Sequence, residues 1–181
     1  TPPPVARPQR IFIGESEESL PTFLIGRRQA IDGPVDETHT ADLKLAGLRI
    51  WVHGWQFPDA MDYWDGNWLR VTVRCGGDGG SVVVRGPILH LSELTRWTGE
   101  AEKLLEALAG EARLSCLEPN LSVLLKAASR GQIMMEVAIT PDHLTQKHWF
   151  QFEIDQSYLP ALIVQCRAIL ETYPLRGERT A

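Results

Sequence analysis

The chain has 181 residues, of which 44% are hydrophobic and 23% are charged, and its formal net charge is −5. This length suits one hydrophobic core rather than two full domains. The composition is that of a globular chain and argues against disorder of the whole chain. Proteins that bind nucleic acid usually carry a basic surface that neutralises the phosphates. The net negative charge of this chain therefore argues against nucleic acid as a direct partner.

Three cysteines, Cys75, Cys116 and Cys166, are far apart in the sequence. Because their number is odd and no Cys-x-x-Cys pair occurs, they indicate neither a disulfide framework nor a zinc site, and buried free thiols are the simplest interpretation. No apolar run approaches the roughly 20 residues that span a bilayer, and no signal segment opens the chain. We therefore expect a cytoplasmic protein with no membrane partner.

The first forty residues are expected to be an extension to the core. They open with three prolines, which lack the amide donor that a strand or helix interior needs, so an extended start is predicted. Two short strand-like pieces follow at residues 10–13 and 22–25. Residues 41–174 are then expected to form a single α+β domain, and residues 175–181 a short polar tail.

Alternating apolar side chains predict antiparallel strands from residue 42 onward. Residues 43–45 and 48–52 indicate a strand pair, or one bulged strand around Gly47. Residues 69–74 alternate between apolar and polar side chains, which is typical of a half-buried antiparallel strand. The glycine-rich run at residues 76–80 predicts a hairpin turn, and the valines after it predict the partner strand.

An apolar stripe at helical spacing predicts a helix that begins near Ser92, a fair N-cap, and stops near Gly110. Gly99 lies in its middle and weakens a helix by about 1 kcal/mol relative to alanine. Either one helix or two helices that separate near Gly99 are therefore expected.

Four more strands are expected in succession, at residues 112–117, 121–127, 133–139 and 149–154. Their short loops favour antiparallel neighbours. A last helix follows the N-cap cluster at residues 155–157 and ends before Pro174. The order of strands, helix, strand meander and helix predicts an α+β fold, in which two α-helices pack against a twisted antiparallel sheet.

The segment DYWDGNWL, residues 62–69, carries the densest group of chemically active side chains. Asp59, Asp62 and Asp65 could bind Ca²⁺ through oxygen ligands, but their spacing fits no twelve-residue calcium loop. Carboxylates flanked by tryptophans are also typical of sugar-processing clefts. The structural interpretation, which we favour, is that the aspartates cap turns while the tryptophans fill core space.

No catalytic group stands out elsewhere. His143 and His148 are five residues apart in a predicted loop, with no acidic ligand placed to complete a zinc site. The serines lack a Gly-x-Ser-x-Gly setting, and the glycine run at 76–80 lacks the Lys-Ser/Thr pair of a phosphate loop. We expect no enzymatic activity, no metal and no cofactor.

Four short segments, in their order and spacing, resemble the WapI-type immunity-protein family. They are WQFP at 55–58, DYWDGNWL at 62–69, LEPNL at 117–121 and FEIDQSYLP at 152–160. The resemblance covers about residues 42–173. It implies a small bacterial cytoplasmic protein that binds and neutralises a cognate polymorphic toxin, catalyses no reaction and has no catalytic residues.

If the resemblance holds, the partner is expected to bind at the same acidic and aromatic segment. Exposed carboxylates would meet basic groups on the toxin, and aromatic side chains would anchor the complex. The candidate partner-binding residues are Trp55, Asp59, Asp62, Tyr63, Trp64 and Asp65. The alternative is a carbohydrate- or metal-binding domain that uses residues 62–69, with Asp62 or Asp65 facing solvent in a pocket between tryptophans.

Overall fold

The structure, a computed structural model, describes residues 40–178 of the chain. The strand-like pieces expected at residues 10–13 and 22–25 lie outside the described residues. Four strands form the first sheet: β1 (Leu43–Leu45), β2 (Leu48–Trp55), β3 (Trp68–Gly77) and β4 (Gly80–His90). Four more form the second: β5 (Glu111–Ser115), β6 (Leu121–Ala127), β7 (Gln132–Ile139) and β8 (His148–Asp155). The helices are α1 (Leu91–Ala107) and α2 (Tyr158–Thr172).

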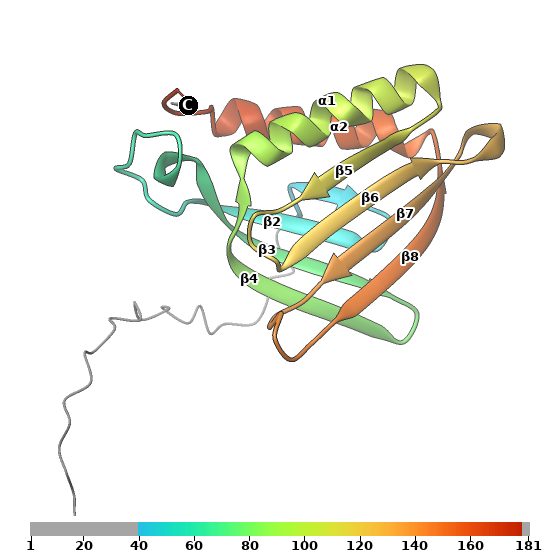
Figure 1. The fold of residues 1–181 in the computed structure, drawn as a ribbon, viewed down its shortest axis with the longest axis horizontal. Helices are drawn as coiled ribbons and strands as arrows, with labels where there is room; N and C mark the ends of the chain where they lie inside the picture. Colours follow the sequence, from blue (N-terminus) through green and yellow to red (C-terminus); the bar gives the residue numbers. More distant parts are fainter. Residues whose placement is uncertain (1–39, 179–181) are drawn as a thin grey trace, which may run out of the picture. The chain divides into compact units, whose positions relative to one another are not determined.

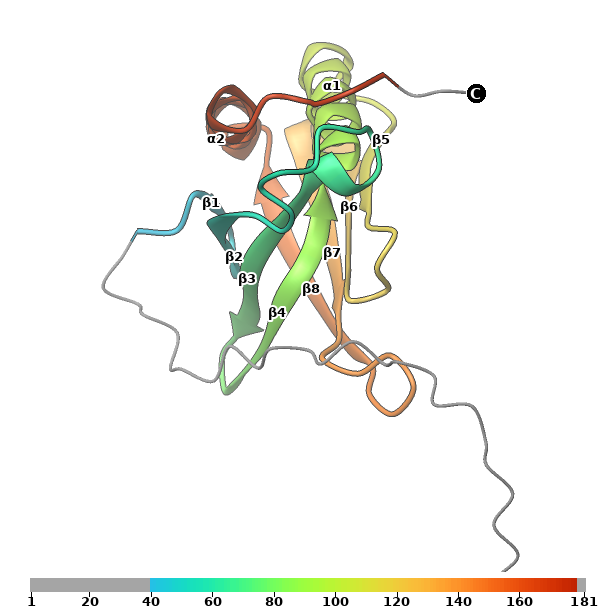
Figure 2. The ribbon, with the colours of Figure 1, turned by 90° about the vertical axis from the view of Figure 1, so that its left-hand side faces the viewer.

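The α+β class and the antiparallel pairing are confirmed, but the strands divide into two sheets where one was expected. Each sheet is a meander whose strands pair in chain order. Helix α1 joins β4 to β5 and carries the chain from the first sheet to the second, so these two strands do not pair. The two sheets face one another, and both helices pack along one edge of the pair (Figures 1 and 2).

The helices cover the edge strands β1 and β5, and each supplies a side chain that bonds to the strand's backbone. Glu100 of α1 accepts a hydrogen bond of 2.7 Å from the amide of Arg113 in β5. Gln165 of α2 accepts from the amide of Lys44 in β1 and donates to its carbonyl. Polar side chains thus take the place of a neighbouring strand at both edges.

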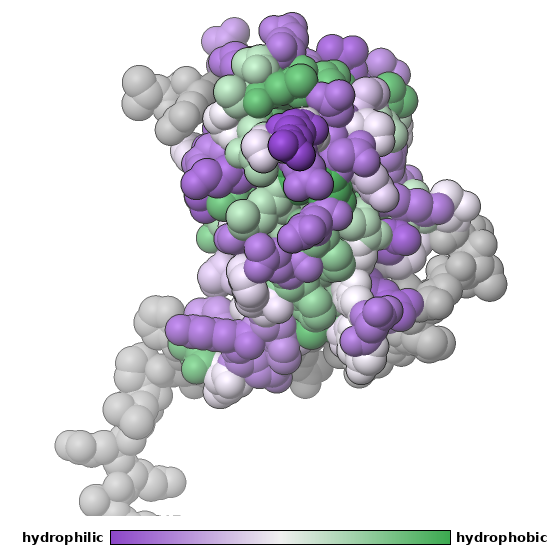
Figure 3. Space-filling model, turned by 90° about the vertical axis from the view of Figure 1, so that its right-hand side faces the viewer, coloured by the Kyte–Doolittle hydropathy of each residue, from purple (hydrophilic) through white to green (hydrophobic). Residues whose placement is uncertain are grey.

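The core lies between the two sheets and beneath the helices. Alternate residues of the strands point inward, and they join the apolar stripes of α1 and α2 in one buried cluster whose largest member is Trp97. On the side that carries the β3–β4 and β6–β7 hairpins, green hydrophobic surface appears in an interrupted column between hydrophilic flanks (Figure 3). Within the described range, neither helix is long and apolar enough to cross a membrane.

Several local predictions are confirmed and one is wrong. Residues 43–52 form a strand pair, and the hairpin turn falls at Asp78 and Gly79. Helix α1 runs unbroken through Gly99, so the single-helix alternative holds. Its N-cap is His90 rather than Ser92, because the His90 ring accepts from the Ser92 amide while the Glu93 carboxylate accepts from the His90 amide.

Candidate functional site

The chain between β2 and β3, residues 56–67, forms a compact loop that we call the aromatic-acidic loop. Asp62 shapes its turn, since Oδ1 accepts hydrogen bonds of 2.9 Å from the Trp64 amide and 2.8 Å from the Asp65 amide. The Asp65 amide is the main reason why the pKa of Asp62 lies below its ordinary value. A short 3-10 turn, Asp65–Asn67, then leads into β3. The expected turn-capping role is therefore confirmed for Asp62. The expectation that the tryptophans fill core space is wrong for Trp64, which is exposed.

The base of the loop is held by Asn67, whose side chain is fully buried. Its Nδ2 donates to the Tyr63 carbonyl over 2.7 Å and to the Arg176 carbonyl over 2.8 Å. Its Oδ1 accepts from the Arg176 amide over 2.9 Å. A buried side-chain amide with both ends bonded fixes the loop to the segment that follows α2, because breaking either contact would leave a desolvated polar group.

Arg176 reaches from that segment into the loop. Its guanidinium carbon lies 3.7 Å from the centre of the Trp55 ring. Its Nη1 donates to the carbonyls of Pro58 and Ala60 over 2.8 and 2.9 Å. Trp55 also packs edge-on against Tyr173, with ring centres 5.5 Å apart. A planar guanidinium can stack on a ring and donate in its own plane, so Arg176 orders the first half of the loop.

His90 supports the second half of the loop from beneath. Its side chain is fully buried, and Nε2 lies 3.2 Å from the Tyr63 carbonyl, which can only accept. The proton therefore belongs on Nε2, which leaves Nδ1 to accept from the Ser92 amide. Burial lowers the pKa of His90 below its ordinary value, which favours this neutral form. The rings of Tyr63, Trp64 and Trp68 all pack around the His90 ring.

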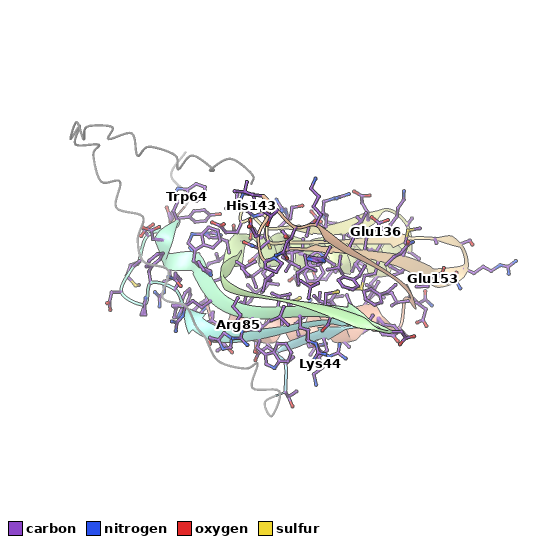
Figure 4. The ribbon with its side chains drawn as sticks, turned by 90° about the horizontal axis from the view of Figure 1, so that it is seen from below. Lys44, Trp64, Arg85, Glu136, His143 and Glu153 are labelled. Carbon is purple, nitrogen blue, oxygen red and sulfur yellow. The ribbon has the colours of Figure 1, made fainter. Side chains whose placement is uncertain are left out.

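The outer surface of the loop combines apolar and acidic side chains. Met61 is 68% exposed, Trp64 is 50% exposed and Phe57 is 45% exposed. Asp59, Asp62 and Asp65 are exposed around them. Figure 4 places Trp64 on the outside of the molecule, at the end where this loop lies.

The six candidate residues thus occupy two different settings. Asp59, Asp62, Trp64 and Asp65 are exposed on the loop, whereas Trp55 and Tyr63 are half-buried and support it. Ring centres of Tyr63 and Trp64 lie 5.2 Å apart in an edge-on contact. The exposed tryptophan therefore rests on an ordered base.

The alternative of a sugar or metal site receives no geometric support from the described residues. Within 40–178, no group of three or more His, Cys, Asp or Glu side chains is arranged to hold a metal. One hollow has a volume of about 500 Å³ and lies beside the β3–β4 hairpin. Another has a volume of about 420 Å³ and lies beside Trp149 on the second sheet. Neither is lined by a residue of the aromatic-acidic loop.

The three cysteines are free, and their thiols are held in the protonated form. Burial raises the pKa of Cys75 and of Cys166 to about 12. Burial also raises the pKa of Cys116 well above its ordinary value, with a further contribution from the nearby charge of Glu93. At neutral pH none of the three supplies the thiolate that nucleophilic chemistry requires.

Sequence reasoning did not identify the residues that hold the loop in place. Arg176 falls in the expected polar tail, and a single arginine there carries no local signal. Asn67 and His90 belong to no recognisable motif in the sequence, and both are fully buried beneath the loop. The hydrogen bonds that join Asn67 to Arg176 and His90 to Tyr63 connect residues far apart in sequence, so no spacing rule could have indicated them.

Comparison with known proteins adds one match. The model of the immunity protein WapI-like family matches residues 41–174. No curated protein and no solved structure matches the chain. The matched range contains every strand and helix described above and the whole aromatic-acidic loop, but it ends before Arg176.

Proposed function

Because the chain belongs to the immunity protein WapI-like family, we propose that it is a non-enzymatic immunity protein of the bacterial cytoplasm. It binds a cognate toxin domain and neutralises it by occupying its surface. The observation that carries the proposal, beside family membership, is the pre-ordered aromatic-acidic loop with Trp64 exposed at its surface.

Order in the loop favours binding. Association costs free energy when side chains and loops must be immobilised, and a loop that is already fixed avoids most of that cost. Asp62, Asn67 and Arg176 fix the backbone before any partner arrives. A rigid tryptophan with a half-exposed face is the type of residue that dominates interface energies.

The negative charge of the aromatic-acidic loop suggests that the partner has a basic surface. Asp59, Asp62 and Asp65 surround the exposed aromatic side chains, and the Asp62 carboxylate is held ionised by two amide donors. Lysine or arginine side chains of a toxin would complement this surface, speed the encounter and disfavour acidic partners.

The test is co-expression with a toxin domain encoded beside this chain, followed by co-purification. We expect rescue of growth and a stable complex with the wild-type chain. Trp64→Ala should weaken the complex by about 2 kcal/mol, the size of an interface hot spot. Trp149→Ala is the matched control, since Trp149 is 59% exposed but lies on the second sheet.

Two results would contradict this proposal in different ways. If the wild-type chain neither rescues growth nor forms a complex, the immunity function is wrong. If Trp149→Ala weakens the complex as much as Trp64→Ala, the function stands but the loop is not the contact surface.

The non-enzymatic part of the proposal has its own measurement. An immunity protein that acts by binding must be present in at least equal amount to the toxin. Titration of toxin activity should therefore end at one immunity protein for each toxin domain. Inactivation of many toxin molecules by one copy would show that the chain acts as an enzyme.

A further inference from the structure

The outer face of the second sheet has a row of small side chains. Ser115 of β5, Ser122 of β6 and Ala138 of β7 are successive partners across the strands, and Trp149 of β8 is the next partner. They alternate with inward-facing residues along their strands, so their side chains point outward. The neighbouring outward row has only long side chains: Arg113, Leu124, Glu136 and Gln151. The change from long to small side chains leaves a depression at one end of this face.

This depression is the hollow of about 420 Å³, whose lining includes all four residues of the row. Its volume falls within the range of about 300–1,000 Å³ that is typical of small-molecule sites. Two strand spacings of about 4.8 Å separate Ser115 from Ala138, so the floor is about 10 Å wide and suits a flat two-ring system. Trp149 is exposed beside that floor, so its ring can pack against the ring of a ligand. Figure 4 shows His143, another lining residue, on the same side of the molecule as Glu136 of β7.

Two ordered segments form the walls of the hollow. The β5–β6 turn contributes Pro119, and the β7–β8 loop contributes His143 and Lys147. The two segments are bonded to each other, because the Thr140 amide donates to the Asn120 carbonyl over 3.0 Å and Asn120 Nδ2 donates to the Thr140 carbonyl over 2.7 Å. Walls that are fixed before a ligand arrives reduce the free-energy cost of binding.

The charge of the lining favours an anionic ligand. The lining contains Lys147 but no Asp or Glu. Within residues 40–178, Lys147 forms no ion pair, so its ammonium group is available. The neighbouring carboxylate of Asp142 is engaged within its own turn, since it accepts from the Leu144 amide over 2.9 Å and from the Thr145 hydroxyl over 2.7 Å. An ammonium group without a carboxylate partner complements a carboxylate on a ligand.

We propose that this hollow binds a small planar aromatic carboxylate. The ring lies on the floor formed by Ser122 and Ala138 and packs against Trp149, while the carboxylate meets Lys147. This site is separate from the aromatic-acidic loop, and binding here does not depend on the immunity function.

A small ligand fits this face better than a second copy of the chain. Stable protein interfaces bury about 800 Å² on each partner, which is far more than the hollow alone offers. The outward rows beyond the hollow carry charged side chains of both signs, among them Glu111, Lys126, Glu136 and Glu153. A second copy on this face would bury these charges as well, whereas a small ligand leaves them in water.

The test titrates the 181-residue chain with three probes and follows binding by NMR. The probes are 2-naphthoate, the neutral and nearly isosteric 2-naphthamide, and cyclohexanecarboxylate, which keeps the charge but lacks the flat ring. We expect 2-naphthoate to bind most tightly. It should shift backbone amide resonances of residues 115–122 and 138–149 and the indole N–H resonance of Trp149, and leave those of residues 56–67 in place.

Two pairs of variants separate shape from charge. Ala138→Leu fills the floor at an exposed position and should weaken 2-naphthoate binding at least tenfold, whereas Gln132→Leu, at an exposed position of the same strand, should not. Lys147→Gln should weaken 2-naphthoate binding about threefold and leave 2-naphthamide binding unchanged. Lys126→Gln, at an exposed position outside the hollow, is the matched control for charge.

Several results would overturn the inference. These are no binding of 2-naphthoate, equal or tighter binding of either other probe, shifts that map outside the hollow, or wild-type affinity in a folded Ala138→Leu variant. A wild-type dimer that Ala138→Leu dissociates would overturn it in favour of a second copy of the chain. Tighter binding of the peptide acetyl-Gly-Trp-Gly-amide than of 2-naphthoate would overturn it in favour of a protein partner.

Discussion

The side-chain amide of Asn67 pairs with both backbone polar groups of Arg176, a residue 109 positions later in the chain. The pairing resembles one rung of a β-ladder, with a side chain in place of the second strand. It places the Arg176 guanidinium over Trp55 and beneath the first half of the aromatic-acidic loop. One buried asparagine thus connects the C-terminal segment to the candidate site.

Asn67→Asp should destabilise the protein and loosen the segment after α2. The substitution keeps the acceptor for the Arg176 amide but replaces the Nδ2 donor with an oxygen that faces the Tyr63 and Arg176 carbonyls. We expect a loss of about 3 kcal/mol in the free energy of unfolding, measured by urea denaturation, because a buried charged group would be left unpaired. Gln151→Glu, at an exposed position of β8, is the isosteric control and should change little. An equal effect of the two substitutions would contradict the role of Asn67.

Glu93→Gln tests the link between α1 and the turn after β5. Oε2 of Glu93 accepts from the His90 amide over 3.1 Å, and Oε1 accepts from the Leu117 amide over 2.6 Å. A glutamine would direct an NH₂ group at one of two N–H donors, so we expect a loss of about 1–3 kcal/mol in the free energy of unfolding. Glu106→Gln, at an exposed position of the same helix, should be nearly neutral. If Glu93→Gln is neutral as well, the carboxylate does not stabilise this junction.

Because His90 is buried in its neutral form, we expect the free energy of unfolding to decrease as the pH falls. The unfolded chain binds a proton at His90 near the ordinary pKa of 6.5, whereas burial lowers the pKa in the folded state. As the pH drops through the unfolded-state pKa, the unfolded state binds more protons than the folded state. The free energy of unfolding therefore decreases until the pH reaches the folded-state pKa. His53 contributes in the same direction.

The pH effect is measured as the slope of the free energy of unfolding between about pH 8 and pH 6, above the range in which most carboxyl groups titrate. His90→Asn should flatten that slope, whatever its effect on absolute stability. His143→Asn, at an exposed loop position, should leave it unchanged. If the His90 variant keeps the wild-type slope, His90 is not the source of the pH dependence.

Two glycine-to-alanine substitutions should have opposite effects. At Gly47 a Cβ would meet the Gly76 carbonyl oxygen at 2.0 Å and the Phe152 ring at 2.5 Å, so Gly47→Ala should cost about 3 kcal/mol through overpacking. At Gly99, inside α1, the Cβ would meet nothing within 4 Å, and Gly99→Ala should stabilise by about 0.5–1 kcal/mol. The thermal unfolding temperatures of both variants are compared with that of the wild type. A Gly47→Ala protein as stable as the wild type would contradict the close packing of the β1–β2 turn against the β3–β4 hairpin.

Local sequence patterns predicted the elements of this fold well because local chemistry determines them. Strand β6 has the predicted bounds, 121–127, and the turn at Asp78 and Gly79 follows from the run of glycines. Helix α2 begins directly after the predicted cap cluster. The N-cap of α1 was misassigned, because histidine is an uncommon cap and its burial beneath the loop depends on contacts with Tyr63 and Trp68.

The division into two sheets and the support of the candidate site could not be read from such patterns. Alternation shows which face of a strand is buried but not which distant layer covers it. The family resemblance and the acidic and aromatic side chains did indicate the loop itself. The contacts that order it join Asn67 to Arg176 and His90 to Tyr63, and pairs so far apart in sequence leave no periodic signal.

The side chains of Glu100 and Gln165 have a consequence for assembly. Each bonds to the backbone of one residue, Arg113 in β5 or Lys44 in β1, and so hinders another chain from extending that edge. Continuation of a sheet across a molecular boundary is therefore expected at β4 or β8, the edge strands on the opposite side of the two meanders from β1 and β5. Fibre growth or strand exchange in this protein would therefore be controlled at those two strands, and β8, with the sequence HWFQFEID, is the one that contains no proline or glycine to interrupt it.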